Sequence, residues 1–322
     1  MKLSRERLRR EAAATGFRAE ILEKVARLLD LLDGIARHPY LKGRLALKGG
    51  TALNLFVFDV PRLSVDIDLN YVGQLDRDAM LAERPEVERA LEAVCGRAGI
   101  AIDRAPDAHA GGKWRLRYGS AEGQGASLEL DVNYMLRAPL WDAGPTTAKP
   151  VGTLPTPTFP VLDIHELAAG KLAALLARRA SRDLFDAHHL LVGGGLDAQR
   201  LRVAFVVYGA MNRKDWRAVS TDDIAFEPRE LWNQLVPTLR PEILDDATDA
   251  IAWARSLNDE CRDALGIVLP LAEAELEFLD RLLDHGEIVP GLLTNDPTLG
   301  ERIAAQPMLA WKALNVRQHK GR

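Results

Sequence analysis

The feature that most constrains the fold is strict alternation of apolar and polar residues in two short segments, 63–72 and 127–134. A period of two residues is that of a β-strand with one buried face. The polar face of the first segment carries Asp66, Asp68 and Asn70. The polar face of the second carries Glu129, Asp131 and Asn133. We therefore expect two neighbouring strands that present carboxylates on their exposed faces.

The first half of the chain supplies the other elements of a mixed α and β layer. Residues 5–37 have helical periodicity, with Ser4 as the expected N-cap. Further helices are expected at 51–58 and 78–98, with Pro85 at a helix start or in a break. Further strands are expected at 45–48, 101–102 and 113–118.

A proline-rich stretch separates this half from the rest. Six prolines lie between residues 138 and 160, which is typical of a linker. The segments after it have helical patterns, at 164–180, 182–193, 197–211, 227–236, 240–258, 260–285, 297–305 and 308–315. We expect an α+β fold, with an α/β domain over residues 1–145 and an all-helical domain over 146–322.

Composition excludes several classes of protein. The net charge of −4 is not that of a dedicated nucleic-acid coat protein, although a local basic patch is compatible with it. Cys95 and Cys261 lack metal-ligand spacing and are expected to be reduced thiols. The charged N-terminus is not a secretion signal, and no segment has the ~20 apolar residues that span a bilayer. A cytoplasmic protein without a membrane partner is expected.

The candidate chemistry lies in residues 47–72. A strand leads into Gly49-Gly50-Thr51 at a helix start, where free backbone N–H groups and a hydroxyl suit a phosphate. Asp66 and Asp68 then point the same way from the next strand, as hard ligands for Mg²⁺. Each motif alone is common in solvated strands and ordinary turns, so the prediction depends on their order and spacing.

Asp131 completes the predicted centre. Phosphoryl transfer with two metal ions places the ions about 3.5–4 Å apart. Two carboxylates on one strand and a third on its neighbour can hold both ions. We therefore expect Asp66, Asp68 and Asp131 as ligands of two Mg²⁺ ions, with a nucleoside triphosphate as substrate.

A family resemblance follows from these residues. Gly-Gly-Thr followed by Arg62-x-Ser64-x-Asp66-x-Asp68 resembles the AbiEii nucleotidyltransferase toxins, including the MenT toxins, of the DNA polymerase β-like superfamily. The family has serine where this chain has Thr51, which keeps a hydroxyl, and 14 residues separate Thr51 from Asp66 here. A second motif, Lys171 with Arg182-Asp183-x-x-Asp186, resembles the family's K…R-D-x-x-D segment.

The second motif also has a physical interpretation. Lys171, Arg178 and Arg182 are spaced to fall near one helical face, where they could neutralise a triphosphate. Asp183 or Asp186 could orient Lys171 or Arg182, or touch the nucleotide. An amphipathic helix with a solvated basic face is the alternative.

Lesser candidates surround these motifs. Lys48 and Arg62 flank the Gly-Gly-Thr turn and could contact phosphate, while Ser64 and Asn70 could support the acidic pair. Trp114, Arg115 and Arg117 could offer stacking and charge to RNA. The basic tail from Lys312 to Arg322 is a weaker RNA candidate, and His188-His189 is a weak metal candidate.

The resemblance implies a polymerase β-like nucleotidyltransferase domain with a mixed sheet. It also implies that NMP is transferred from an NTP to the 3′ end of tRNA, so that growth stops, and that an AbiEi-like antitoxin is the partner. Two other hypotheses stay open. One is a nucleotidyltransferase that modifies a small molecule or a protein, and the other is a catalytically idle NTP-binding interaction module.

Overall fold

The chain divides into two compact units. The computed structural model describes residues 3–106, 111–245 and 249–320. The first unit comprises Met1–Arg137, Ala143–Leu162 and Pro237–Thr248. The second comprises Ala138–Asp142, Asp163–Val236 and Asp249–Arg322. Each unit is internally packed, so each is described by itself.

The expected boundary between residues 145 and 146 is wrong. It falls inside strand β6, Gly144–Thr147, which pairs with β7, Thr158–Val161, in the sheet of the first unit. Prolines are compatible with this pairing because β6 is an edge strand, where a missing N–H breaks no interior ladder. The proline-rich stretch is thus mostly part of the sheet.

The first unit contains a mixed seven-stranded sheet in the order β3-β4-β5-β2-β1-β7-β6. The remaining strands are β1 Leu45–Lys48, β2 Asp66–Tyr71, β3 Ala101–Arg104, β4 Gly111–Gly119 and β5 Gly125–Asn133. Strand β2 is antiparallel to β1 and parallel to β5. The two alternating segments of the sequence are therefore hydrogen-bonded neighbours, as expected.

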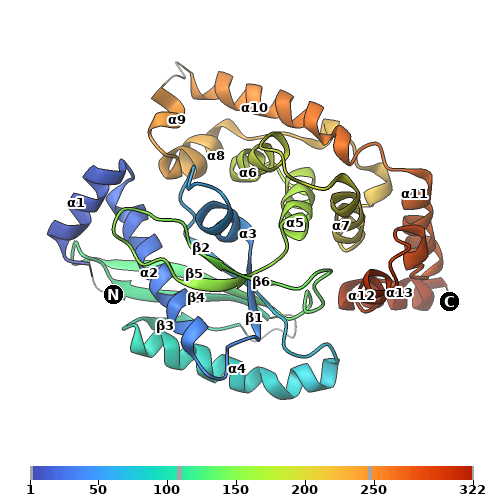
Figure 1. Cartoon of the computed structure of the whole chain (residues 1–322), viewed down its shortest axis with the longest axis horizontal. Coiled ribbons are helices and arrows are strands. Elements are labelled where there is room, and N and C mark those ends of the chain that lie inside the picture. The colour runs from blue at the N-terminus through green and yellow to red at the C-terminus, as the bar shows by residue number, and fades with distance from the viewer. Residues whose placement is uncertain (1–2, 107–110, 246–248, 321–322) are drawn as a thin grey trace. The chain divides into compact units, whose positions relative to one another are not determined.

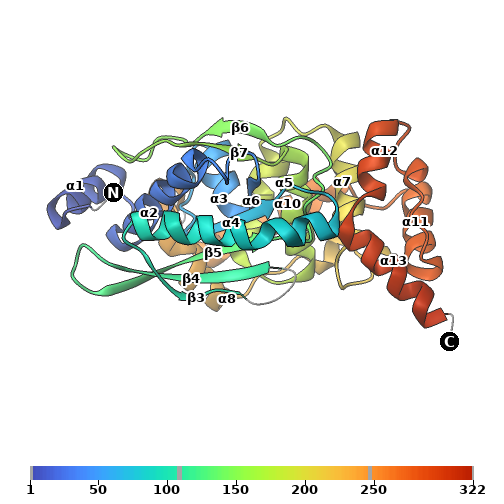
Figure 2. The ribbon, with the colours of Figure 1, turned by 90° about the horizontal axis from the view of Figure 1, so that it is seen from below.

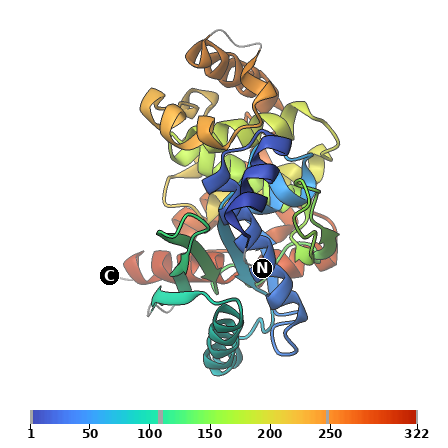
Figure 3. The ribbon, with the colours of Figure 1, turned by 90° about the vertical axis from the view of Figure 1, so that its left-hand side faces the viewer.

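Helices α1 Arg5–Thr15, α2 Ala19–Arg37 and α4 Arg77–Arg97 belong to this unit and are coloured blue to teal in Figures 1 and 3. The expected helix over 5–37 is two helices, because Gly16 at φ 73° ends α1. The expected cap is confirmed, since the Ser4 side chain accepts from the Arg7 N–H.

Helices α2 and α4 cover one face of the sheet (Figure 2). The guanidinium of Arg27, on α2, lies 5.1 Å from the ring centre of Tyr118. The guanidinium of Arg84, on α4, lies 4.9 Å from the ring centre of Tyr134. The apolar side chains of the alternating strands point to this covered face, which leaves the polar residues on the other.

Pro85 lies inside α4, so the expectation of a start or break there is wrong. An interior proline costs a helix roughly 3 kcal/mol. The buried side chains of Val87, Leu91 and Val94 hold the rest of α4 against the unit and offset that cost.

The second unit is helical, as expected. Its longer helices are α5 Ile164–Ala177, α6 Ser181–Val192, α7 Ala198–Ala210, α10 Ala250–Ala264, α11 Glu273–Asp280, α12 Pro297–Ala304 and α13 Pro307–Lys320. Short turns lie between them, among them α8 Pro228–Glu230, while α9 Glu242–Asp245 belongs to the first unit. None of the helices in the described residues is long and apolar enough to cross a membrane.

Candidate active site

The three aspartates lie on one face of two paired strands. In the β2–β5 register, Asp68 is opposite Asp131 and Asp66 is opposite Glu129. Residues directly opposite each other in adjacent strands point to the same side of the sheet. All three aspartates are partly exposed, whereas the alternate residues Ile67 and Leu130 are buried. The topology thus places the predicted carboxylates side by side.

A transverse row of charged residues passes through Asp68. Lys48 is opposite Asp68 in the β1–β2 pair, and Lys113 is opposite Asp131 in the β4–β5 pair. The row therefore reads Lys48, Asp68, Asp131, Lys113 across four strands. Two carboxylates lie at its centre with a cation on either side.

The turn after β1 comes close to Asp68. Gly49 begins the short helix α3, Gly49–Ala52, with φ at 71°, a conformation that favours glycine. A Cβ at this position would lie 2.4 Å from the Asp68 Oδ2. Only glycine therefore lets the backbone of this turn approach the carboxylate so closely.

The Thr51 hydroxyl is directed at the start of β2. Its side chain is fully buried, and Oγ1 donates to the carbonyl oxygen of Asp66 at 2.5 Å. This hydrogen bond fixes α3 to the start of β2. The hydroxyl proton is thus engaged with the strand, and a phosphate contact through Thr51 stays a prediction.

Arg62 and Ser64 precede β2 and are buried too, with exposed fractions of 2% and 6%. The Arg62 Nη1 donates to the carbonyl oxygen of Leu63 at 3.0 Å. This geometry favours a structural role for Arg62 over the expected contact with phosphate. Asn70 is likewise buried, on the same strand face as the aspartates.

The second motif forms a buried charge cluster within the second unit. The Lys171 Nζ lies 2.8 Å from Asp183 Oδ1 and 3.0 Å from Asp186 Oδ2. The Arg178 Nε donates to Asp183 Oδ2 at 2.6 Å. Burial would raise the pKa of Asp183, but Lys171 and Arg178 outweigh it, and the pKa is lowered. Both aspartates thus hold the Lys171 ammonium in place.

The expectation that Lys171, Arg178 and Arg182 share one helical face is wrong. Helix α5 ends at Ala177, so Arg178 follows its last turn in extended conformation. Arg182 lies on the separate helix α6. The helical spacing fails because α5 ends between these residues, at a point that the sequence does not mark with a proline or glycine.

Comparison with known proteins identifies the family. The model of the nucleotidyl transferase AbiEii toxin, type IV TA system, matches residues 30–256, which is more than half of the chain. The chain belongs to the AbiEii family. The expected membership is confirmed, and with it nucleotidyltransferase activity and the toxin class. No curated protein matches the chain.

Among solved structures, this AbiEii protein is similar to MenT4, a nucleotidyltransferase toxin from Mycobacterium tuberculosis. The TM-score is 0.57 at 18% sequence identity, and the match covers 94% of this chain and 99% of that chain. The expected fold, a nucleotidyltransferase sheet domain with a helical domain, is thereby confirmed.

The three aspartates of this AbiEii protein would suit Mg²⁺ in their ligand type and in their position on one face of the sheet. Asp66, Asp68 and Asp131 offer hard oxygen ligands from one strand face, and Gly49 leaves room beside Asp68. Within residues 3–106, 111–245 and 249–320, no three His, Cys, Asp or Glu side chains gather closely enough to form a metal site. The fit to Mg²⁺ is therefore one of ligand type and strand register.

Two predicted RNA contacts in this AbiEii chain have other roles. Trp114 is only 2% exposed and faces the covered side of the sheet, so stacking on RNA is excluded. Lys312 donates to the carbonyl oxygens of Ala210 and Asn212 and is therefore a structural contact. Residues 321–322 of the basic tail lie outside the described residues.

His188 of the candidate metal pair His188-His189 has a protein partner, since its Nε2 pairs with Glu260 Oε2 at 2.7 Å.

Lys113 is the charged residue that the sequence interpretation missed. Its Nζ donates to Glu129 Oε2 at 2.6 Å. Its pKa is raised, first by this hydrogen bond and also by Asp66 and Asp68. The alternation of Lys113, Arg115 and Arg117 in the sequence indicates that these residues share the exposed face of β4. It does not show that Lys113 lies opposite Asp131, because that depends on the register between the strands.

Proposed function

We propose that this AbiEii-family protein transfers NMP from Mg²⁺·NTP to the 3′-hydroxyl of tRNA. The observation that carries the proposal is the pairing of Asp68 with Asp131 on one strand face, beside the Gly49 turn. The family model, which describes nucleotidyl transferase toxins, supports the reaction type. The tRNA acceptor is inferred from the family resemblance and from a local basic strand in an otherwise acidic chain.

The carboxylates have distinct positions in this proposal. Asp66 and Asp68, two residues apart on β2, hold the metal-bound triphosphate at the centre of the face. Asp131, one strand further, orients the acceptor hydroxyl. Bound Mg²⁺ would lower the pKa of that hydroxyl and stabilise charge on the phosphate oxygens. The acceptor hydroxyl loses its proton to solvent water, its oxygen forms a bond to the α-phosphorus, and pyrophosphate leaves with the electrons of the broken P–O bond.

The phosphate-binding groups lie on the β1 side. Gly49 and Gly50 offer backbone N–H groups at the start of α3, and Lys48 offers a cation in the same row as Asp68. We propose that Lys171, held by Asp183 and Asp186, also binds phosphate, with Arg178 and Arg182 as additional positive charge. Thr51 fixes α3 to β2 through its hydrogen bond to the Asp66 carbonyl and thereby positions this turn beside the phosphate.

The partner in this proposal is an antitoxin. Membership in a family of type IV toxin–antitoxin systems implies one, and we propose that it is AbiEi-like. Growth inhibition on expression, relieved by that antitoxin, is the expected phenotype. Inhibition that persists in an Asp66→Ala variant would favour an idle NTP-binding module instead.

The test is transfer from each of four labelled NTPs to total tRNA, total protein or an aminoglycoside. We expect label in tRNA, dependent on Mg²⁺. Asp131→Asn should lower kcat/KM by about 10³-fold or more, the scale of losing an essential electrostatic group in the transition state. Glu129→Gln, two residues away on the same face, is the matched control and should retain activity within about tenfold.

The outcomes separate the proposal from its competitor. Label in protein or aminoglycoside but not in tRNA would show that the acceptor is wrong while the nucleotidyltransferase mechanism stands. Equal losses of kcat/KM in Asp131→Asn and Glu129→Gln would show that Asp131 is not a catalytic residue. Both variants should unfold at wild-type temperatures, because both side chains are partly exposed.

A further inference from the structure

Strand β4 carries a row of basic side chains on the same face as the aspartates. Lys113, Arg115 and Arg117 are exposed, whereas the alternate residues Trp114 and Leu116 are buried. The three basic residues are opposite Asp131, Glu129 and Ser127 of β5. Because opposite residues share a face, the row continues the surface that carries the carboxylates.

Arg104 extends this row to β3. It is exposed and lies opposite Arg115 in the β3–β4 register. Like charges directly opposite each other destabilise a strand pair. An anion between the two guanidinium groups would remove this repulsion.

The other two cations of the row have partners that an anion can displace. Lys113 pairs with Glu129 and Arg117 pairs with Asp103, with all four side chains between about one third and two thirds exposed. Exposed pairs of this kind contribute only ~0–1 kcal/mol. A shallow hollow of about 430 Å³ lies beside Arg115 and Arg117, and Lys24 lines it as well. Phosphate groups can therefore reach these cations.

The order of the strands puts the row and the Gly49 turn on opposite sides of the aspartates. Strand β1, which leads into that turn, adjoins β2 on one side, and β5 followed by β4 adjoins it on the other. At ~4.8 Å per strand, β4 lies about 10 Å from β2. Successive cations of β4 are about 7 Å apart, comparable with successive phosphates of an extended nucleic-acid strand.

We propose that Arg104, Lys113, Arg115 and Arg117 bind the phosphate backbone of the RNA acceptor and lead its 3′ end toward Asp131. This inference rests on the proposed function for the direction of the strand, although RNA binding is measured without turnover. The nucleotide occupies the β1 side and the acceptor the β4 side, with the carboxylates between them. The exposed arginines of β4 thus serve as a phosphate track.

The test is binding of labelled total tRNA to the full-length chain at several salt concentrations. Each phosphate contact on a single strand contributes about 0.7 to the slope of log K against log [salt]. Arg104→Gln/Arg115→Gln should therefore reduce the slope by about 1.4 and weaken binding about 25-fold at 0.1 M salt. Arg104→Lys/Arg115→Lys keeps both charges and should restore most of the slope.

The matched control is Arg77→Gln/Arg89→Gln, which removes two charges from arginines of α4 that are each 66% exposed. It should bind tRNA with the wild-type slope. Inorganic phosphate at matched ionic strength should compete only weakly if a backbone track binds RNA, and strongly if the arginines form a site for a single phosphate, which would overturn the proposal.

Transfer and binding then separate the two proposals. Wild-type transfer to tRNA with an unchanged slope in Arg104→Gln/Arg115→Gln would overturn the track and leave the function standing. A reduced slope in the double variant, with no transfer to tRNA by the wild type, would support the phosphate track and overturn the proposed tRNA reaction. In transfer assays, the double variant should raise KM for tRNA while leaving KM for NTP unchanged. Circular dichroism checks that the variants fold.

Discussion

At Gly49 the backbone needs glycine for two reasons that can be separated by experiment. Its φ of 71° disfavours other residues, and a Cβ would meet the Asp68 carboxylate. Gly43 has φ 78°, and a Cβ there would meet nothing within 4 Å. Gly49→Ala and Gly43→Ala should each cost roughly 1–2 kcal/mol of unfolding free energy from backbone strain. Only Gly49→Ala should also displace the carboxylate.

We therefore expect Gly49→Ala to lose about 100-fold in the rate of NMP transfer, the scale of a displacement of about 1 Å at a reacting centre. Gly43→Ala should keep its activity. The measurements are transfer rates together with urea unfolding of each variant. Equal activity in the two variants would show that the closeness of Gly49 to Asp68 has no catalytic consequence.

At this scale, strand alternation predicted the shared face of Asp66 and Asp68 because that pattern is local. The roles of Thr51 and Arg62 could not be predicted in this way. The Thr51 hydroxyl has its partner at the carbonyl of Asp66, and Arg62 is buried and forms a β-bridge with Leu239, far away in the sequence. Burial of a polar side chain is a tertiary property, whereas its suitability for phosphate is visible in the sequence.

At the scale of elements, Thr51 joins α3 to β2. Thr51→Val keeps the volume but leaves the Asp66 carbonyl without this donor, which should cost about 1–3 kcal/mol. Thr51→Ser keeps the hydroxyl and should cost less. Urea unfolding measures the cost, and KM for NTP measures any contact with substrate. A raised KM for NTP in Thr51→Val with unchanged stability would show that the hydroxyl contacts the phosphate of the substrate.

Glu166 joins α5 to two other segments of the second unit. Its Oε2 accepts from the Trp141 N–H at 3.2 Å, and its Oε1 accepts from the Tyr208 hydroxyl at 3.0 Å. Burial raises the pKa of Glu166 to about 7, although the hydrogen bonds from Leu140, Trp141 and Tyr208 act in the opposite direction. The carboxyl is therefore easier to ionise in the unfolded chain than in the folded one.

This difference predicts how stability depends on pH. The stabilising contribution of protonated Glu166 is complete below the ordinary pKa of 4.5 and is lost as the pH rises to about 7. Glu166→Gln cannot ionise, so its unfolding free energy relative to wild type should increase by about 3 kcal/mol between pH 4.5 and 7 and then stay level. Urea unfolding across this range measures it, and a constant difference would contradict the prediction.

At the scale of the whole molecule, the α+β fold and the helical second unit could be predicted from periodicity. The domain boundary could not, because β6 and β7 are short and contain prolines. Nor could the return of residues 237–248 to the first unit, where the Arg240 N–H donates to the carbonyl of Pro61 at 2.9 Å. Contacts between segments so far apart in the chain leave no periodic signal.

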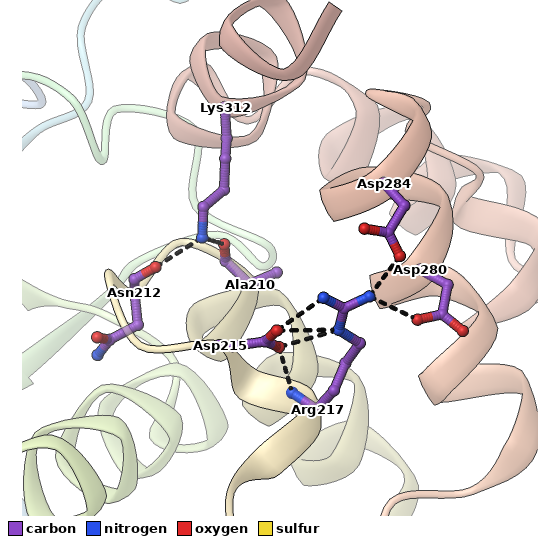
Figure 4. A network of polar contacts seen from close by, with 7 residues as sticks. All are labelled: Ala210, Asn212, Asp215, Arg217, Asp280, Asp284 and Lys312. Carbon is purple, nitrogen blue, oxygen red and sulfur yellow. Dashed lines mark hydrogen bonds and ion pairs between the residues drawn. The ribbon is translucent and has the colours of Figure 1, made fainter. Parts of the chain in front are cut away.

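The attachment of the last helices within the second unit depends on two different cations (Figure 4). Arg217 lies 2.9 Å from Asp280 and 2.5 Å from Asp284, and it also pairs with Asp215. The acidic partners are about half exposed and keep their hydration when Arg217 is removed. Lys312 on α13 instead donates to two backbone carbonyls, of Ala210 at 2.7 Å and Asn212 at 2.6 Å.

We expect the removal of Lys312 to loosen α13 more than the removal of Arg217 loosens α11. Lys312→Met leaves two carbonyl oxygens without a donor, at a cost of about 1–3 kcal/mol, whereas Arg217→Gln should cost about 1 kcal/mol or less. Hydrogen exchange should show faster opening of residues 307–319 in Lys312→Met, with transfer activity unchanged. Faster hydrogen exchange of these helices in Arg217→Gln than in Lys312→Met would contradict the prediction. The helices would then be held mainly by the solvated ion pairs and not by hydrogen bonds to backbone carbonyls.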